Sequence, residues 1–467
     1  TGALIYLTPK VKEKNIPPPP DPADNALWGG IVLLGKGVTQ KNGNGEVSVE
    51  GIPTTEPRGL YGGFDNLDNS GILRYISIRH GGRLLTSGNE LNGLTLAAIG
   101  SGTTLEYIEI YANSDDGIEF FGGAPNLKHA VVAFAEDDSF DWDEVYSGQG
   151  QFWFSIQRPD IADAGGELDG STPDDLVPYS NPTVYNWTHI GSGAGATASN
   201  PVGWLFRAGT AGKVANSIVT EMKNKAIEVQ DKNSGTNDSH QKLRNGELII
   251  ANNLFWANGS NNQIDASSTG IIRITSGQPT QDDPNGTDLI NHLVANSNSI
   301  SNPGIVSVSR EQDNRLDPRP SASGAAYTTP RAAIPSNPFF TEVDYKGAFS
   351  ADTSEFWING WTALKRNNHL PDVLISAKDL DEVVAEKELV KIFPNPVGNG
   401  QLLVIEPLVD GMDVVRIYTI DGKLVKELRQ ELTNKTQYFI SFENSGNYLV
   451  QLVSKEGLST VKSVIVK

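Results

Sequence analysis

The chain has 467 residues, of which 38% are hydrophobic and 20% charged, and this composition is typical of a globular protein with two or three domains. Its formal net charge of −19 disfavours nucleic acid as a partner, because nucleic-acid binding needs clustered Lys and Arg, and it permits bound cations. The sequence has no cysteine, which excludes disulfides, thiol catalysis and cysteine-based zinc sites.

The first expected element is an extended N-terminal segment over residues 1–25, because "IPPPPDPAD" (16–24) is rich in proline. The chain does not begin with Met and lacks the basic and apolar parts of a signal peptide, so we expect a mature or trimmed chain. From residue 26 to about 350, short apolar runs are separated by Gly, Asn, Asp and Ser. This pattern predicts short β-strands.

Two interleaved series of repeats lie in this region. "GILRYISIRHGG" (71–82), "TTLEYIEIYANS" (103–114) and "PNLKHAVVAFAE" (125–136) superimpose, with apolar residues at the same three places. The second series is "NGLTLAAIGSG" (92–102), "DDGIEFFGG" (115–123) and "DDSFDWDEV" (137–145). A return after roughly 20 to 30 residues is the period of a β-solenoid. We therefore predict an all-β solenoid over residues 26–372.

A third series places three asparagines at equivalent positions. Asn216, Asn252 and Asn296 lie in "VANSIV", "IANNLF" and "VANSNS". Stacked Asn side chains can hydrogen-bond along the axis of stacked strands, so we expect these three to form a ladder.

The best helical candidate follows at residues 352–372. Trp357, Trp361 and Leu364 have helical spacing there. We interpret this segment as a helix or turn that caps the last rung, because the ends of a solenoid need covering.

The C-terminal region differs in composition. A charged linker over residues 373–388 leads to a segment, 389–467, in which apolar and polar residues alternate strongly. Asp421-Gly422 between two strand-like runs indicates a hairpin. About seven short strands in this length predict a small Ig-like β-sandwich.

This C-terminal segment resembles the sorting domain of proteins exported by the type 9 secretion system of Bacteroidetes. The match is carried by "KIFPNPVGNG" (391–400), "VRIYTIDGKLVKEL" (415–428), "SGNYLVQLV" (445–453) and "KSVIVK" (462–467). Its signature residues are Phe393, Pro394, Asn395, Pro396, Asp421, Gly422, Lys423, Gly446, Tyr448 and Lys467. The resemblance implies secretion to the extracellular face of the outer membrane. The implied partners are the translocon, its outer-membrane shuttle barrel, and a sortase that attaches the protein to lipopolysaccharide.

Residues 26–370 are similar to right-handed parallel β-helix surface proteins that carry this sorting domain. The matching stretches are "LWGGIVLLG" (27–35), "YGGFDNLDNSGILRYISIRHGG" (61–82), "NELNGLTLAAIGSGTTLEYIEI" (89–110), "DDSFDWDEVYSGQGQFWFSIQ" (137–157) and "FWINGWTAL", together with "DDGIEFFGG". The resemblance implies a fold and a cell-surface location, and no defined activity.

The acidic repeat "NSDDGIEFFGGAPNLKHAVVAFAEDDSFDWDE" (113–144) has three open interpretations. In the first, the two Asp-Asp pairs, Asp115-Asp116 and Asp137-Asp138, mark equivalent corners of the solenoid. Their carboxylates then accept hydrogen bonds from turn amides, and this accounts best for the first Asp of each pair.

The second interpretation is a calcium site, because hard cations take several oxygen ligands. The candidate ligands are Asp65, Asp68 and Asn69 in "FDNLDNSG" (64–71), with Asp141 and Asp143.

The third interpretation is catalysis by Asp116, Asp137 and Asp138, as in the polygalacturonase type of inverting hydrolase. That type also needs a Gly-His-Gly and an Arg-x-Lys on the next rungs, and "QGQFWFSIQRPD" has neither. We therefore favour a non-enzymatic adhesin or binding protein, for which glycans are one candidate ligand, with a polysaccharide hydrolase or lyase as the alternative.

Overall fold

The computed structural model describes residues 5–7, 21–40, 45–50, 52–84, 91–171, 173–174, 176–199, 201–232, 237–259, 261–267, 270–275, 282–372, 390–407, 412–419, 423–432, 438–442, 444–454 and 459–467. The chain divides into two compact units, Thr1–Val373 and Leu374–Lys467. The predicted linker, residues 373–388, lies wholly outside the described residues, so its extent stays a prediction.

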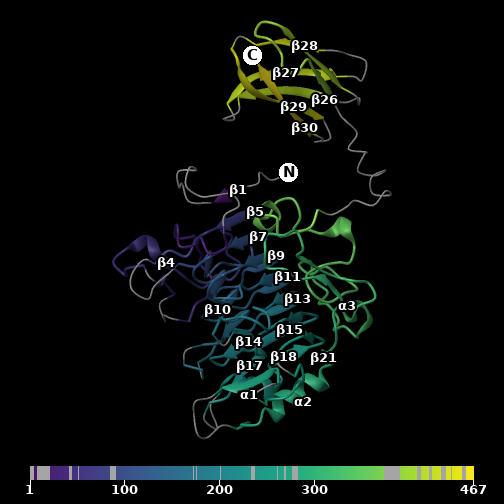
Figure 1. The fold of residues 1–467 in the computed structure, drawn as a ribbon. Coiled ribbons are helices and arrows are strands. Elements are labelled where there is room, and N and C mark those ends of the chain that lie inside the picture. Colours follow the sequence, from purple (N-terminus) through teal and green to yellow (C-terminus); the bar gives the residue numbers. More distant parts are fainter. Residues whose placement is uncertain are drawn as a thin grey trace. The chain divides into compact units, whose positions relative to one another are not determined.

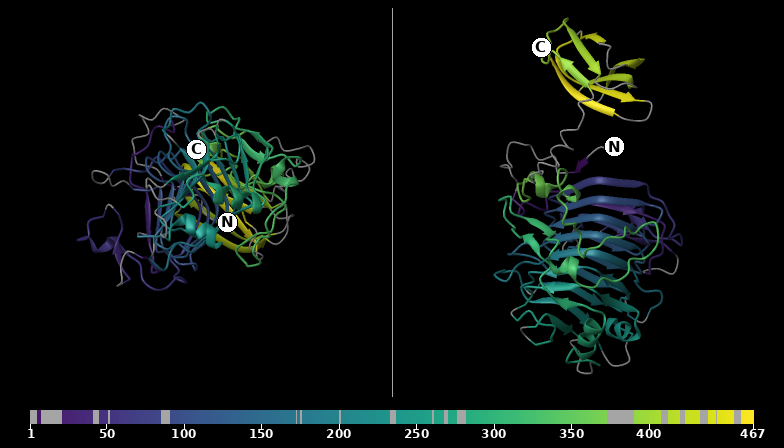
Figure 2. Two further views of the ribbon diagram at one scale, coloured as in Figure 1. Left: turned by 90° about the horizontal axis from the view of Figure 1, so that it is seen from below. Right: turned by 90° about the vertical axis from the view of Figure 1, so that its right-hand side faces the viewer.

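Two parallel sheets form the first unit (Figure 1). Sheet A contains β1 (Ile5–Leu7), β5 (Ile72–Arg79), β7 (Thr104–Tyr111), β9 (Asn126–Ala133), β11 (Gln149–Ile156), β13 (Thr183–Ile190), β15 (Gly212–Ala215), β16 (Ile218–Thr220), β18 (Leu248–Ala251), β19 (Leu254–Trp256) and β21 (Ser299–Ile300). Sheet B contains β2 (Ile31–Leu34), β6 (Leu94–Ala97), β8 (Ile118–Phe121), β10 (Phe140–Asp143), β12 (Gly166–Asp169), β14 (Val202–Arg207), β17 (Lys225–Gln230) and β20 (Ile272–Thr275). The chain alternates between A and B, with two short strands of A in succession at β15–β16 and at β18–β19. Each passage through A and B is one rung of a parallel β-helix, as predicted (Figure 2).

The strand register confirms the repeats read from the sequence. Ile76, Ile108 and Ala130 are neighbours on β5, β7 and β9, and Asp138 lies 22 residues after its equivalent, Asp116. Alternate side chains of both sheets point inward and form one continuous core. The aromatic residues of that core stack along it, for example Phe140 on Trp153 with ring centres 4.5 Å apart. Rings buried in this way are core packing.

The asparagine ladder exists, but the predicted residues are wrong by one or two positions. Ser217 donates its amide N–H to Asn253 Oδ1 at 2.8 Å, and Asn253 donates its own to Asn298 Oδ1 at 3.0 Å. Asn216 and Asn252 instead have positive φ (52° and 56°), and their side chains bond a loop outside the solenoid. A left-handed residue between two short strands turns the chain, so the inward position falls on the next residue.

Short helices and one antiparallel pair of strands are inserted between the strands of the two parallel sheets. Two α-helices, α1 (Ser239–Asn245) and α2 (Thr287–Ala295), lie at the C-terminal end of the solenoid. A small antiparallel pair of strands, β3 (Val47–Ser48) and β4 (Leu60–Tyr61), is joined through η1 (Pro57–Gly59). No helix in the described parts of the chain is both long and apolar enough to span a bilayer.

Residues 301–372, here called the return segment, run back along the outside of the solenoid. The segment holds β22 (Ile305–Ser307), β23 (Asp317–Pro320), α3 (Ala325–Thr328), η2 (Thr353–Glu355) and α4 (Ala363–Arg366). The predicted cap at 352–372 is therefore mostly turns with one four-residue helix, and it covers early rungs, not the last one. The amides of Ala363 and Leu364 bond the buried carboxylate of Glu109 on β7 at 2.7 and 3.2 Å. Burial raises the pKa of that carboxyl group.

The second unit is a sandwich of two antiparallel sheets. One contains β24 (Val390–Phe393), β25 (Leu402–Pro407) and β28 (Tyr438–Ser441), and the other β26 (Met412–Thr419), β27 (Leu424–Leu432), β29 (Gly446–Ser454) and β30 (Ser459–Val466). Apolar residues of both sheets share one core, including Ile405, Ile417 and Leu452. The Ig-like classification of this sandwich stays a prediction.

Candidate functional site

An acidic groove lies on the outer face of sheet B. Phe120, Trp142 and Leu168 point into the core from β8, β10 and β12. Because side chains alternate along a strand, the residue before each of them points outward. Those residues are Glu119, Asp141 and Glu167, and the strand register makes them direct neighbours on successive rungs. The solenoid thus stacks three carboxyl groups in one column, with rungs about 4.8 Å apart.

A cavity of about 490 Å³ covers this column. It is lined by Val49, Glu50, Leu91, Asn92, Thr95, Asp115, Asp116, Glu119, Phe121, Asp137, Asp141, Asp143, Glu167, Asp169 and Arg207. Nine of these residues are acidic and one is basic, so the groove as a whole favours cations.

The carboxyl groups on the groove floor are held out of water. Asp141 is 9% exposed, Glu119 and Asp116 8% each. Burial is the first cause that raises the pKa of each of these three groups well above the ordinary carboxyl range, and the neighbouring carboxylates raise it further. Burial also raises the pKa of Glu167, to about 8. A bound cation would reverse this effect, since it favours the charged form.

Asp141 carries the clearest sign of a ligand. Its Oδ1 is buried and has no hydrogen-bond partner among the residues that the structure describes. One oxygen from each of Asp116, Glu119 and Asp141 lies within 4.8 Å of the others. Hard divalent cations such as Ca²⁺ bind to all-oxygen ligand sets of this kind. The residues present therefore fit a calcium ion held by Asp116, Glu119 and Asp141.

Arg207 is the basic residue of the groove. Its Nη2 lies 2.6 Å from Glu167 Oε2, and its Nε lies 2.7 Å from Asp169 Oδ1. The attraction of these carboxylates outweighs the effect of burial and raises the pKa of Arg207. The guanidinium is thus held protonated, so it can bind an anion but is poorly placed to accept a proton.

The second Asp of each Asp-Asp pair has a structural task. Asp116 Oδ1 accepts from the amide of Asp138 at 3.0 Å, and Asp138 Oδ1 accepts from the amide of Ala164 at 2.5 Å. Each carboxylate thus bonds the corner of the next rung. The turn-amide interpretation accounted best for the first Asp of each pair, and for Asp115 and Asp137 that role stays a prediction. Asp115 and Asp137 also line the cavity, and Asp137 is exposed.

The remaining predicted ligands lie apart from the cavity lining. Asp65 Oδ1 accepts from the Leu67 amide, Asp68 Oδ2 from the Ser70 hydroxyl, and Asn69 Oδ1 from the Gly71 amide. These side chains shape their own exposed loop. The predicted set of five is therefore divided, with Asp141 and Asp143 in the groove and the other three in the loop.

The sequence interpretation missed Glu119, Glu167, Asp169 and Arg207. Glu119 was within reach, because the 22-residue offset that relates the Asp-Asp pairs also relates Glu119 to Asp141. The other three could not be predicted, because a longer loop before β12 changes the spacing of the repeat. Their place follows only from the pairing of β12 with β10 and β14.

The sorting-signal residues gather at the ends of the sandwich strands. Asn395 Oδ1 accepts from the Ile465 amide at 2.9 Å, and the Lys467 amide donates to Val397 O at 2.9 Å. The "FPNP" stretch and the C-terminus, far apart in sequence, thus form one surface, on which Phe393 is 41% exposed. Tyr448 is buried near Gly446 and bonds Asn444 O, and Lys423 closes the β26–β27 hairpin. Asp421 and Gly422 lie outside the described residues.

Two family descriptions match the chain. A pectate-lyase-like beta helix domain matches residues 21–292, and a secretion system C-terminal sorting domain matches residues 391–467. No curated protein matches the chain.

Proposed function

Because this chain belongs to the pectate-lyase-like β-helix domain family, we propose that its acidic groove binds Ca²⁺ and, through it, an anionic glycan. The observation that carries the proposal is the buried Asp141 oxygen that has no hydrogen-bond partner in the described residues and lies beside Glu119 and Asp116. Calcium supplies positive charge that joins protein carboxylates to carboxylates of a ligand. The Arg207 guanidinium offers a second, permanent positive charge in the same cavity.

The C-terminal sorting domain directs the protein to the cell surface or the extracellular space through the type 9 secretion system. Within that route we propose that the surface formed by Phe393, Asn395 and Lys467 docks on the outer-membrane shuttle barrel. A sortase then removes the domain and attaches the β-helix to lipopolysaccharide.

The geometry favours binding over catalysis. A lyase needs a base, and the groove's Arg207 is paired with two carboxylates that keep it protonated. In the hydrolase alternative, Asp116 and Asp138 would act as acid and base, but one oxygen of each already accepts from an amide of the next rung. Asp116 and Asp137 also have oxygens within 4.8 Å of each other, whereas inverting enzymes separate the two carboxyl groups by roughly 6.5–9.5 Å. We therefore propose an adhesin or binding protein.

The test measures binding of the full chain to immobilised polygalacturonate with millimolar Ca²⁺ or with a chelator. We expect binding only with calcium, together with a higher Tm of the β-helix, because a ligand that binds the native state stabilises it. Asp141→Asn should weaken binding at least tenfold. Asp68→Asn, in the exposed loop, should leave it unchanged.

Two outcomes would contradict the proposal. Binding that changes neither with the chelator nor in Asp141→Asn would show that the groove does not bind the glycan. Unsaturated products that vanish in Arg207→Gln, or new reducing ends that vanish in Asp138→Asn, would establish the lyase or hydrolase alternative.

A further inference from the structure

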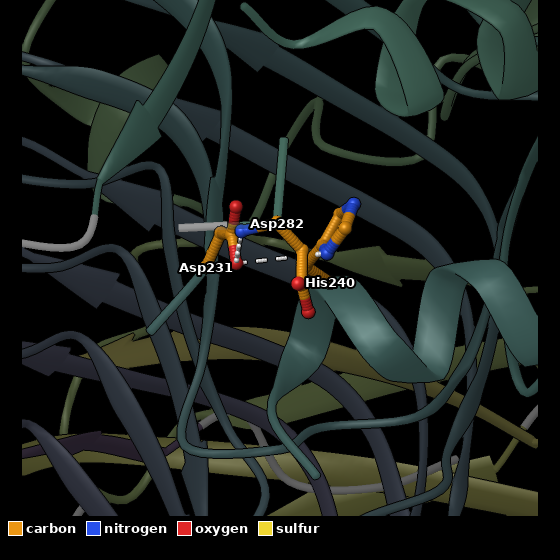
Figure 3. A group of neighbouring side chains, drawn as sticks. All are labelled: Asp231, His240 and Asp282. Carbon is orange, nitrogen blue, oxygen red and sulfur yellow. Dashed lines mark hydrogen bonds and ion pairs between the residues drawn. The ribbon is translucent and has the colours of Figure 1, made fainter. Parts of the chain in front are cut away.

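A second group of ionisable side chains surrounds a histidine at the C-terminal end of the β-helix, outside the acidic groove. His240 lies on α1, Asp231 directly follows β17, and Asp282 lies shortly before α2 (Figure 3). A carboxylate oxygen of Asp231, a carboxylate oxygen of Asp282 and a ring nitrogen of His240 lie within 4.8 Å of one another. Three separate segments of the chain thus bring one possible ligand each to a single point.

The ring of His240 is fully buried, and its two nitrogens differ. Nε2 lies 3.2 Å from Asp288 Oδ2 and hydrogen-bonds to it. Nδ1 lies 3.7 Å from Asp231 Oδ1 and has no hydrogen-bond partner among the described residues. A carboxylate oxygen can only accept, so Nε2 must carry the hydrogen. In the neutral ring, Nδ1 therefore turns its lone pair toward the carboxylate of Asp231.

Such an arrangement needs a positive charge at its centre. A lone pair and a carboxylate oxygen at this distance repel each other unless a cation or a proton lies between them. The wider cluster is also rich in acid: Asp283 Oδ2 lies 3.9 Å from His240 Nε2, and Arg244 approaches Asp288 only at 3.6 Å.

We propose that Asp231, His240 Nδ1 and Asp282 form a binding site for a divalent transition-metal ion of the Zn²⁺ class. Ligand atoms about 2.0–2.2 Å from a tetrahedral ion lie roughly 3.4 Å apart, so the 3.7 Å between Nδ1 and Asp231 Oδ1 needs only a small adjustment. Asp282 is exposed, which leaves the fourth position to water.

The surroundings already hold the ligands in place. Asp288 accepts from Nε2 and so fixes the ring orientation, as carboxylates do behind metal-bound histidines. Asp231 Oδ2 accepts from the amide of Asp283 at 2.7 Å and Oδ1 from the amide of Asp282 at 3.2 Å, and these two bonds hold the carboxylate with Oδ1 beside the histidine. Imidazole favours zinc over calcium, whereas the groove offers only oxygen. The two sites would therefore select different ions, zinc at His240 and calcium in the acidic groove.

The experiment titrates ZnCl₂ into the tag-free, chelator-stripped full chain by calorimetry, and measures Tm with and without zinc. We expect one equivalent to bind and to raise the Tm, because the ion joins the end of β17, α1 and the loop before α2. Asp282→Asn changes an exposed ligand and should fold normally while weakening zinc binding at least tenfold. Asp265→Asn, a half-buried carboxylate in another turn, should bind zinc as the parent chain does.

Co²⁺ provides a second readout, since its visible absorption reports whether nitrogen and oxygen ligands surround it tetrahedrally. His240→Asn should abolish that absorption. The proposal is overturned if the parent chain binds no zinc at micromolar concentration, or if Asp282→Asn and His240→Asn bind it unchanged. None of these outcomes depends on calcium in the groove, so the two proposals fail separately.

Discussion

At the scale of the residue, His369 shows how burial sets the charge of one side chain. Its Nδ1 lies 3.0 Å from Glu311 O, and its Nε2 lies 3.0 Å from the Tyr111 hydroxyl. A carbonyl only accepts, so Nδ1 carries the hydrogen and Nε2 accepts from the tyrosine. Burial lowers the pKa of His369 to about 4. The neutral ring thus ties the return segment to β7.

This pKa predicts an acid-sensitive contribution to stability. Between about pH 6.5 and 4 the unfolded chain binds a proton on this ring and the native chain does not, so the free energy of unfolding falls as the pH falls. The full difference amounts to roughly 3 kcal/mol. In urea unfolding, the gap between the parent chain and His369→Gln should shrink between about pH 7.5 and pH 4.5. A gap of equal size at both pH values would contradict the prediction.

Residue types alone located part of the groove. Asp116 was visible from the repeated Asp-Asp pair, and Asp141 and Asp143 as acids close to the second pair, and the structure places all three in one cavity. Glu167 and Arg207 were not visible, because their approach depends on the lengths of loops between rungs. His240 and Asp231 carry no motif, and only the fold brings them together.

At the scale of the element, the asparagine ladder shows which part of a repeat can be predicted from the sequence. Asn253 accepts from the Ser217 amide and donates to Val214 O and Asn298 Oδ1, all in the interior. The sequence predicted a ladder because asparagine recurs, but two adjacent asparagines, Asn252 and Asn253, compete for the same place. Only the positive φ of Asn252 decides which one points inward.

The two neighbours give a matched pair of substitutions. Asn253→Ala should lower the free energy of unfolding by roughly 2–4 kcal/mol, because it leaves buried amide and carbonyl groups without partners. Asn252→Gly should cost less than about 1 kcal/mol, because glycine accepts positive φ freely. Urea unfolding of both variants checks this. Equal losses would mean that the buried ladder contributes nothing beyond its exposed neighbour.

At the scale of the whole molecule, the chain consists of two units with separate cores. The sequence predicted the β-helix well, because the same pattern of apolar residues recurs in successive rungs. It predicted the path of residues 301–372 poorly, because that segment has no repeat and its position is set by contacts such as Glu109 with Leu364.

Separate cores predict that the sorting domain can be removed without harm to the β-helix. Deletion of residues 389–467 should leave the Tm of the β-helix unchanged, while the protein accumulates in the periplasm instead of reaching the surface. Cell fractionation and calorimetry measure the two effects. Normal surface display after the deletion would contradict the role of this domain as the export signal.

The return segment has a consequence for how this protein can evolve. Repeat proteins usually gain or lose rungs freely, because each rung contacts only its neighbours. Here one continuous segment bonds Asn252, Asn216, Gln151 and Glu109, which lie on rungs spread over much of the solenoid. Inserting or deleting a rung between these anchors would move them apart or together by about 4.8 Å. The return segment therefore fixes the number of rungs. In evolution, the loops between strands can change far more easily than the number of rungs.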